Sequence, residues 1–247
     1  MNVAIQREAT VYDEPEVIAR SAQELVGDLN PQQAEAVQYR GQALLIGAGA
    51  GSGKTRVLTR RIAWILSQFG AWPSQILAIT FTNKAAAEMR ERLGSLIGPV
   101  AQRMWVSTFH SACVRILRRD IDRIGFDKDF TIYDTDDSKR VVRDILKELN
   151  LDEKAFQPRS VLSVISHAKD EYQSPEEFAA KHANENDWKM SRIAKVYAAY
   201  EKKLKEAGAF DFDDLIYQTV ILLSEHEDVR EFYQNKYKYL LVDEYQD

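Results

Sequence analysis

The stretch Gly47-Ala48-Gly49-Ala50-Gly51-Ser52-Gly53-Lys54-Thr55 decides the fold of this 247-residue chain. An apolar run over 42–46 precedes it, and apolar residues at helical spacing over 57–69 follow it. We therefore expect a strand, a glycine-rich loop and then a helix. Such a loop directs backbone N–H groups and the positive end of a helix dipole at phosphate oxygens. The order of elements predicts the phosphate-binding loop of an α/β nucleotide-binding protein.

Two side chains of the loop carry specific roles. Lys54 can reach the β- and γ-phosphates, and the Thr55 hydroxyl can bind Mg²⁺. The pattern G-x-x-x-x-G-K-[ST] requires glycine where this chain has Ala48, although alanine is small enough for the loop to close. A glycine-rich turn with an exposed lysine is the plainer alternative. The residues assigned to the nucleotide are Ala48, Gly49, Ala50, Gly51, Ser52, Gly53, Lys54, Thr55 and Arg56.

The last residues of the chain supply acidic groups for the same site. The apolar run 239–242 has the length of a strand and is followed directly by Asp243 and Glu244. At a strand tip, Asp243 could hold Mg²⁺ opposite Thr55, and Glu244 could orient and deprotonate a water molecule in line with the γ-phosphate. Taken alone, the segment also fits a strand that ends in a solvated acidic turn. Its combination with the phosphate-binding loop favours the catalytic interpretation.

Composition places the chain among ordinary globular proteins. With 45% hydrophobic and 29% charged residues it can form one large domain or two modest ones. The net charge of -5 gives no global indication of nucleic-acid binding. No apolar run reaches the roughly 18–20 residues that span a bilayer, and no signal-peptide core is present, so we expect a cytoplasmic protein without a membrane partner. The single cysteine, Cys113, is expected to be a buried thiol, and the four histidines lack metal-ligand spacing.

The chain changes character along its length. We expect a flexible extension over 1–27, with a short helix near 16–25, and then a helix that Asn30 caps and Pro31 begins. Strands are predicted over 42–46, 76–81, 104–109 and 239–242, alternating with helices as a doubly wound parallel sheet requires. Amphipathic helices are predicted over 114–121, 141–149, 161–168 and 193–204. The predicted domains are a nucleotide-binding domain over 28–112 and 206–247 and an inserted, all-helical subdomain over 113–205.

With these motifs in place, the chain resembles the superfamily 1 DNA helicases of the UvrD/PcrA/Rep type, over 29–247. The segments that carry the resemblance are Leu29-Asn30-Pro31-Gln32-Gln33 (the Q motif), 48–55 (Walker A), 80–86 (motif Ia), 107–111 (motif Ib), Asp211-Phe212-Asp213-Asp214-Leu215 and Asp243-Glu244-Tyr245-Gln246-Asp247 (motif II). The resemblance implies a RecA-like P-loop domain with a helical insertion. It also implies ATP hydrolysis, with Mg²⁺, coupled to 3′-to-5′ movement on single-stranded DNA and unwinding at single-strand/duplex junctions.

The resemblance also assigns roles to residues. It implies that Gln33 reads adenine and that Lys54, Asp243, Glu244 and Gln246 are catalytic. The residues that it implies for DNA binding are Thr80, Phe81, Thr82, Asn83, Thr108, Phe109 and His110. The two phenylalanines could stack on bases, but the strand pattern alone fits core residues equally well. Since the second RecA-like domain of such helicases supplies arginines to the site, we expect this chain to be an N-terminal part with little activity of its own.

Two other functions remain open at this point. The same motor occurs in ATP-dependent exonuclease subunits that resemble RecB or AddA. The isolated chain could also be a non-catalytic module that binds nucleotide or DNA. ATP turnover that DNA stimulates would identify an enzyme, whereas binding without turnover would identify a module.

Overall fold

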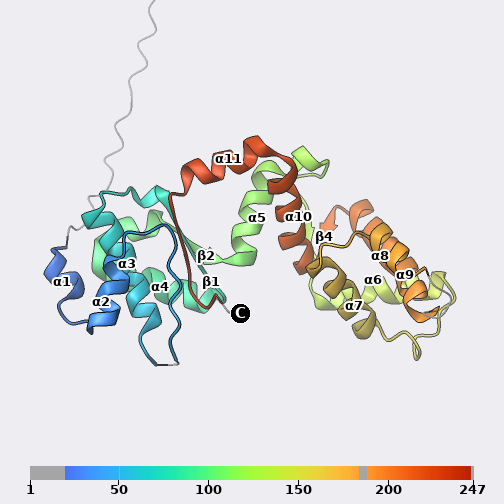
Figure 1. The fold of residues 1–247 in the computed structure, drawn as a ribbon. Helices are drawn as coiled ribbons and strands as arrows, with labels where there is room; N and C mark the ends of the chain where they lie inside the picture. The colour runs from blue at the N-terminus through green and yellow to red at the C-terminus, as the bar shows by residue number, and fades with distance from the viewer. Residues whose placement is uncertain (1–19, 50, 184–187, 246–247) are drawn as a thin grey trace, which may run out of the picture. The chain divides into compact units, whose positions relative to one another are not determined.

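The computed structural model describes residues 20–49, 51–183 and 188–245, and these residues form two compact units. Of the described residues, those up to Thr108 and those from Asn235 onward form the first unit, and those between Phe109 and Gln234 form the second. Figure 1 shows that sheet strands occur in the first unit and that helices dominate the second. The protein is therefore a mixed α/β chain with a parallel sheet.

The sheet of the first unit has three parallel strands in the order β2-β1-β5. These strands are β1 (Ile76–Thr80), β2 (Trp105–Thr108) and β5 (Tyr239–Val242), as the sequence predicted to within a residue or two. Thr80 pairs with Thr108 in β2, and Ile79 pairs with Val242 in β5. The carboxyl ends of the three strands therefore meet at one edge of the sheet, where open α/β sheets bind their ligands.

The predicted strand over 42–46 is wrong. The segment forms no strand, and Leu45 is 80% exposed. The reason lies in the sheet, where β1 already has a neighbour on each side. Only the outer edges of β2 and β5 could still accept another strand. The segment 42–46 pairs with neither edge in the described structure. An apolar run without a ladder of hydrogen bonds stays extended but does not become a strand.

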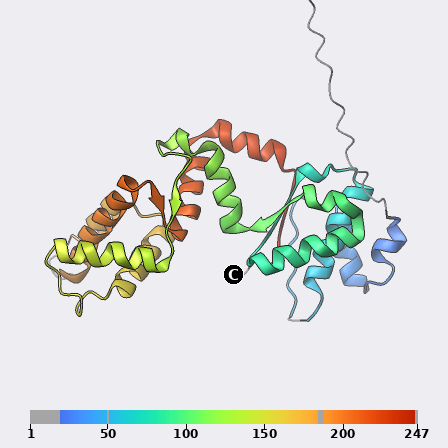
Figure 2. The ribbon, with the colours of Figure 1, turned by 180° about the vertical axis from the view of Figure 1, so that it is seen from behind.

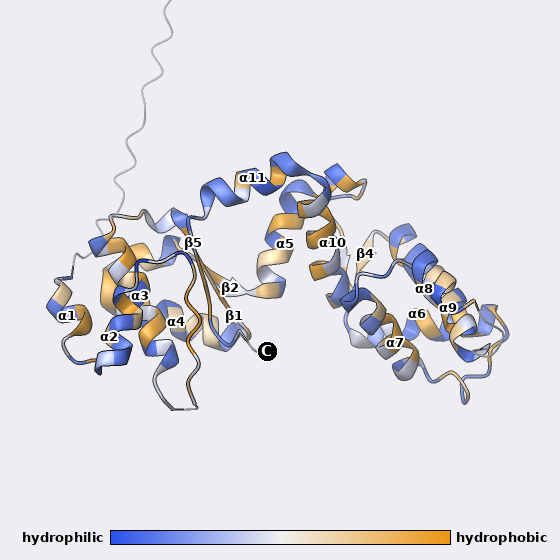
Figure 3. Cartoon of the chain, in the orientation of Figure 1, coloured by the Kyte–Doolittle hydropathy of each residue, from blue (hydrophilic) through white to orange (hydrophobic). Residues whose placement is uncertain are grey.

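Helices cover the sheet of the first unit. These helices are α1 (Ala22–Val26), α2 (Pro31–Gln38), α3 (Lys54–Gln68) and α4 (Asn83–Ile97), with short 3₁₀ turns at Pro73–Gln75 and Gly98–Arg103. The Asn30 side chain caps α2 and Pro31 is its first residue, as predicted. Figure 3 shows both hydrophobic and hydrophilic residues on α3, as expected for an amphipathic helix. Residues such as Ile62, Met89 and Ala78 join these elements in one buried core.

The chain folds before residue 28, where the sequence suggested a flexible extension. Ser21 caps α1 in a capping box with Glu24, and Leu25 is fully buried in the core of the first unit. Arg60 of α3 donates hydrogen bonds to the carbonyl oxygens of Glu24 and Leu25, and Arg20 donates to that of Leu96. The short helix predicted near 16–25 corresponds in part to α1. Residues 1–19 lie outside the described chain, so the prediction of flexibility is corrected for residues 20–27.

The second unit is mainly helical. Its helices are α5 (Phe109–Asp120), α6 (Thr135–Glu148), α7 (Pro158–Asp170), α8 (Pro175–Lys181), α9 (Trp188–Glu206), α10 (Phe212–Glu225) and most of α11 (Glu227–Lys236), with a 3₁₀ turn at Ile121–Ile124. Two short parallel strands, β3 (Thr131–Ile132) and β4 (Ala209–Phe210), also belong to it. The expectation of an all-helical composition is therefore wrong.

The division of the chain also differs from the predicted one, which assigned 206–234 to the nucleotide-binding domain. Helix α10 lies beside α5 in both Figure 1 and Figure 2, and the two helices pack together. Leu215 and Leu222 of α10 are buried. These apolar contacts place 206–234 in the second unit. Among the described helices we find none with the length and apolar character that a bilayer crossing requires.

A buried charge cluster joins α7, α9 and α10 in the second unit. The Lys169 side chain is 1% exposed, and its Nζ lies 2.6 Å from Asp214 Oδ1, 2.8 Å from Glu201 Oε1 and 3.0 Å from Asp211 Oδ2. Burial opposes the charged form of Lys169, but the three carboxylates outweigh burial and hold its pKa well above the ordinary value. Asp211 and Asp214 also form the capping box of α10. The motif 211–215 therefore has a structural role.

Candidate nucleotide-binding site and strand ends

The loop between residue 47 and α3 has the backbone that a phosphate-binding loop requires. Gly51 and Gly53 have φ angles of 75° and 85°, a left-handed conformation that glycine adopts without strain. Gly53 is the N-cap residue of α3, and no side chain caps the helix. The first N–H groups of α3 are thus free to bind an anion. Ala50, also predicted to contact nucleotide, lies outside the described residues.

The Lys54 ammonium group lies against its own loop. Its Nζ donates hydrogen bonds to the carbonyl oxygens of Ala48 at 2.8 Å and Gly49 at 3.1 Å. The Ser52 hydroxyl donates to the same Gly49 oxygen at 2.7 Å. These contacts hold the positive charge of Lys54 at the loop, where it could bind a phosphate group. Ala48 takes part through its backbone carbonyl oxygen. The alanine in place of the usual glycine therefore does not remove this contact with Lys54.

Thr55 and Asp243 lie together although 188 positions separate them in the sequence. Thr55 Oγ1 donates a hydrogen bond to Asp243 Oδ2 at 3.2 Å. Asp243 is largely buried, and its N–H donates to Ile79 O at 2.8 Å, which extends the β1–β5 pairing by one residue. Two oxygen atoms at this separation suit adjacent positions on Mg²⁺, because ligands at 2.0–2.1 Å in an octahedron lie about 3 Å apart. The arrangement can therefore hold a divalent cation.

Glu244 follows Asp243 and is exposed. Its φ angle is +57°, which is uncommon for a residue other than glycine and turns the chain sharply at the end of β5. An exposed carboxylate at this position is accessible to water, as a general base must be. Gln246, also predicted to be catalytic, lies outside the described residues.

Gln33 links the start of α2 to the phosphate-binding loop. Its Oε1 accepts a hydrogen bond from the Asn30 N–H at 3.2 Å, and its Nε2 donates to Ser52 O at 2.9 Å. The side chain thus lies beside the loop, as a residue that reads a bound base would. Arg56 lies on α3 and pairs with Asp28 at 2.5 Å. Sequence reasoning missed Asp28, since only the tertiary fold brings it to Arg56.

The residues predicted to contact DNA fall into two classes by burial. Thr80 and Thr108 are buried at the paired ends of β1 and β2. Phe81 is 56% exposed, and Asn83 is exposed in the first turn of α4. The Thr82 side chain caps α4 by accepting a hydrogen bond from the Ala85 N–H at 3.1 Å. Of the predicted DNA contacts in the first unit, Phe81 and Asn83 are therefore the two that are exposed to solvent and do not cap a helix.

In the second unit, Phe109 is the first residue of α5 and is 43% exposed. The next residue, His110, meets Phe212 of α10 edge to face, with ring centroids 5.7 Å apart. Phe212 is also exposed and was not anticipated as part of the site. Phe81 and Phe109 are thus not core residues, which was the alternative that the strand pattern left open. Among the described residues there is no group of three or more histidine, cysteine or acidic side chains that could hold a metal ion.

Comparison with known proteins agrees with this geometry. The model of the UvrD/REP helicase N-terminal domain matches residues 29–247. ATP-dependent DNA helicase PcrA from Bacillus subtilis (strain 168) is 54% identical over 224 residues, which are 91% of this chain and 30% of that protein. The PcrA proteins of Staphylococcus epidermidis (strain RP62A) and Staphylococcus aureus (strain NCTC 8325) are 52% and 51% identical over 223 residues, 90% of this chain and 30% of each. The chain thus spans about a third of these relatives. On the family match, which covers most of its length, this chain belongs to the UvrD/REP helicases and contains their N-terminal domain.

Proposed function

We propose that this chain is the N-terminal, ATP- and single-stranded-DNA-binding part of an ATP-dependent 3′-to-5′ DNA helicase. The observation that carries the proposal is the contact between Thr55 and Asp243, since it joins the phosphate-binding loop to the acidic end of β5. These are the two halves of a nucleotide-hydrolysis site. The relatives named PcrA are described as ATP-dependent DNA helicases, which supports the same function.

ATP and Mg²⁺ are the proposed cofactors. Lys54 would bind the β- and γ-phosphates in exchange for its two contacts with loop carbonyls. Thr55 and Asp243 would hold Mg²⁺, directly or through water, which neutralises charge on the phosphates when it is bound. Glu244 would accept the proton of the attacking water molecule. Gln33 would favour adenine, because its amide can donate and accept hydrogen bonds at the same time.

The first unit is proposed to be a RecA-like domain and the second an insertion into it. The first unit consists of two segments of sequence, and the second is continuous between them, which supports this description. A second RecA-like domain of the whole protein would supply the arginines that stabilise charge on the γ-phosphate. Because such arginines are worth about 10³–10⁵ in rate, we expect slow hydrolysis from this chain alone.

Single-stranded DNA would bind at the carboxyl ends of β1 and β2. Phe81 and Phe109 directly follow these strands and are exposed, so each could stack on a base without sequence preference. Asn83 and His110 would contribute hydrogen bonds to the sugar-phosphate backbone. Single-strand/duplex junctions are the proposed substrate of the whole protein. The names of the similar proteins favour this function over the motor of an exonuclease subunit.

Titration with a fluorescent ATP analogue in the presence of Mg²⁺ tests the proposal. Lys54→Ala should weaken binding about tenfold or more, since a hydrogen bond to a charged group is worth about 1.5–3 kcal/mol. Lys84→Ala is the matched control, because this lysine is exposed on α4 and makes only a 4.0 Å contact with Glu88. Equal affinity of the Lys54→Ala variant and the unmodified chain would overturn the assignment. ATP turnover that DNA stimulates would separate an enzyme from a module that only binds.

A further inference from the structure

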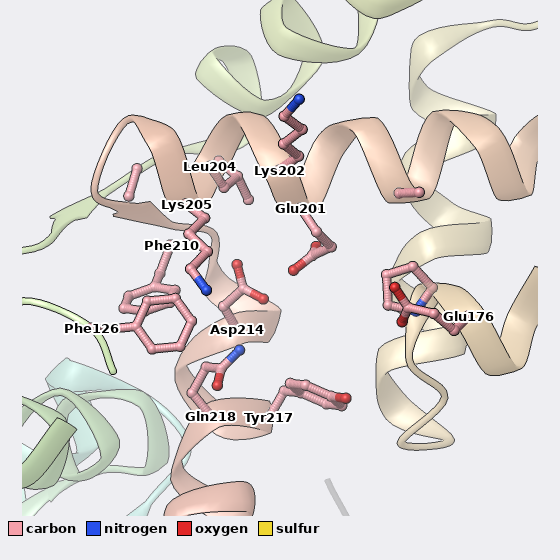
Figure 4. Close-up of a pocket in the computed structure, with 13 residues that line it drawn as sticks. Phe126, Glu176, Glu201, Lys202, Leu204, Lys205, Phe210, Asp214, Tyr217 and Gln218 are labelled. Atoms are coloured by element: carbon pink, nitrogen blue, oxygen red, sulfur yellow. The ribbon is translucent and has the colours of Figure 1, made fainter. Parts of the chain in front are cut away.

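A cavity of about 380 Å³ lies in the second unit, apart from the residues assigned to nucleotide and DNA. It is bounded by α8, α9, α10 and β4, and its volume lies in the range of small-molecule pockets. The lining residues that matter here are Phe126, Glu201, Lys205, Phe210, Asp214 and Gln218. Figure 4 shows the carboxylates of Glu201 and Asp214 and the amide of Gln218 turned toward the same space.

The Gln218 side chain has no partner for its amide. The residue is 9% exposed, and its side chain makes no hydrogen bond to any described residue. Gln218 also lines the cavity, so a ligand there could bond to both its oxygen and its nitrogen. This residue therefore indicates a polar ligand.

Three carboxylates share one buried ammonium group beside the cavity. Asp211, Asp214 and Glu201 surround the single ammonium group of Lys169. Glu201 Oε1 is shielded from solvent and accepts no hydrogen bond, although it lies 2.8 Å from Lys169 Nζ. The contact between Glu201 and Lys169 is an ion pair. Lys169 is the buried ammonium group of this cluster, and the two other lysines that line the cavity, Lys202 and Lys205, are exposed.

Aromatic rings form another part of the lining and also favour a cation. Phe126 and Phe210 meet edge to face, with centroids 5.0 Å apart. The ammonium group of Lys205 lies 5.3 Å from the centroid of the Phe126 ring. Lys205 is exposed at the end of α9, so this flexible side chain can leave the cavity at little cost. The Lys205 ammonium group thus already lies over the face of the Phe126 ring that a cationic ligand would use.

We propose that this cavity binds a guanidinium group, as an arginine side chain of a partner protein carries. Guanidinium is planar and presents five N–H donors, so it can bond to the Glu201 carboxylate and the Gln218 oxygen together. It also stacks on aromatic rings and is less strongly hydrated than an ammonium group. A ligand that binds here would displace Lys205 from the Phe126 ring.

The probe is Nα-acetyl-arginine N-methylamide, titrated into the ¹⁵N-labelled 247-residue chain and followed by NMR. The Gln218 side-chain amide should shift in a saturable way. The citrulline analogue has nearly the same shape without the charge and should bind about tenfold more weakly or worse. Glu201→Gln should weaken arginine binding by a similar factor, whereas Lys205→Ala should strengthen it. Glu206→Gln is the matched control, because this carboxylate is exposed on the same helix and lies outside the lining.

Three results of these titrations would overturn the proposal, and a comparison with lysine supplies a fourth. These are a shift that does not saturate, equal binding of the arginine and citrulline compounds, and an unchanged affinity in Glu201→Gln. Equal binding of the matching lysine compound would also overturn it, since the site would then select charge alone. If Glu201→Gln does not fold, Gln218→Leu replaces it. That variant removes an unsatisfied amide and so should keep the fold while weakening arginine binding about tenfold.

Discussion

Replacing Lys169 with methionine should destabilise the second unit strongly. The substitution keeps most of the side-chain volume but removes the charge that three carboxylates share, at 2.6, 2.8 and 3.0 Å from Nζ. Removing one partner of a buried ion pair typically costs about 3–5 kcal/mol, because the other partner stays buried without compensation. We expect a loss of about that size for Lys169→Met. Surface lysines offer a comparison, since exposed pairs contribute far less.

Native-state hydrogen exchange with detection by mass spectrometry can measure this loss in each unit separately. A loss of about 3–5 kcal/mol raises the exchange rate of the most protected amides about a hundredfold or more, since each 1.4 kcal/mol is a factor of ten. Peptides from α7, α9 and α10 should show this change, and peptides from α3 and α4 should not. Lys203→Met is the matched control, because Lys203 makes an exposed 2.8 Å pair with Glu148. Its exchange should be nearly unchanged.

The pH dependence gives a second test of the same cluster. The raised pKa of Lys169 in the folded state stabilises the protein below the ordinary lysine pKa of 10.5, and this stabilisation is lost as pH rises through the folded-state pKa. Burial raises the pKa of Asp214 well above its ordinary value, and Lys169 only partly offsets this effect. In Lys169→Met this offset is absent, so the variant should lose stability as pH rises above the ordinary aspartate pKa of 3.8 and through the raised pKa of Asp214 in the folded state. A loss below about 1 kcal/mol, or a pH dependence equal to that of the unmodified chain, would refute the reasoning.

Three further outcomes are expected. In the full-length protein, Glu244→Gln should keep ATP binding and lower steady-state turnover about 10²–10⁴-fold, and more than a tenth of the original rate would exclude Glu244 as the base. Phe81→Ala in that protein should weaken single-strand affinity by about 1–3 kcal/mol in a fluorescence titration and leave basal hydrolysis intact; a collapse of both would show a structural role instead. Leu25→Ala should destabilise the first unit by about 2–5 kcal/mol in exchange measurements on α3, because Leu25 is fully buried, whereas a flexible extension would show no effect.

Local signals in the sequence predicted much of the fold. Asn30 followed by Pro31 identified the start of α2, because capping depends on a few neighbouring residues. The runs that became β1, β2 and β5 were equally clear, since their residues are apolar and β-branched or aromatic. The segment 42–46 is also mainly apolar and is no strand. Strand formation needs a neighbour to pair with, and the composition of the segment does not supply one.

In the candidate site too, features encoded by local sequence motifs were predictable, and contacts that depend on the tertiary fold were not. The glycines of the phosphate-binding loop and Thr55 were predictable from the spacing of the loop motif, and Asp243 from its place at the end of an apolar strand. The pairing of Asp28 with Arg56 was not, since surface ion pairs leave no periodic signal. Lys169 and Gln218 were also missed. A lysine or glutamine on a helix is exposed in most proteins, and only the packing of α7, α9 and α10 buries these two.

The two-segment construction of the first unit has a consequence for how the chain folds. Strand β5 can join β1 only after the whole second unit has been synthesised between them. Within that unit, Arg119 lies 3.5 Å from the centroid of the Phe232 ring, and Tyr233 donates a hydrogen bond to Asp120 at 2.9 Å. If these contacts form first, the loop between β2 and β5 shortens from roughly 130 residues to roughly 20, which lowers its closure entropy by about 2 kcal/mol. Early folding of the second unit would thus accelerate the late step in which Asp243 reaches Thr55.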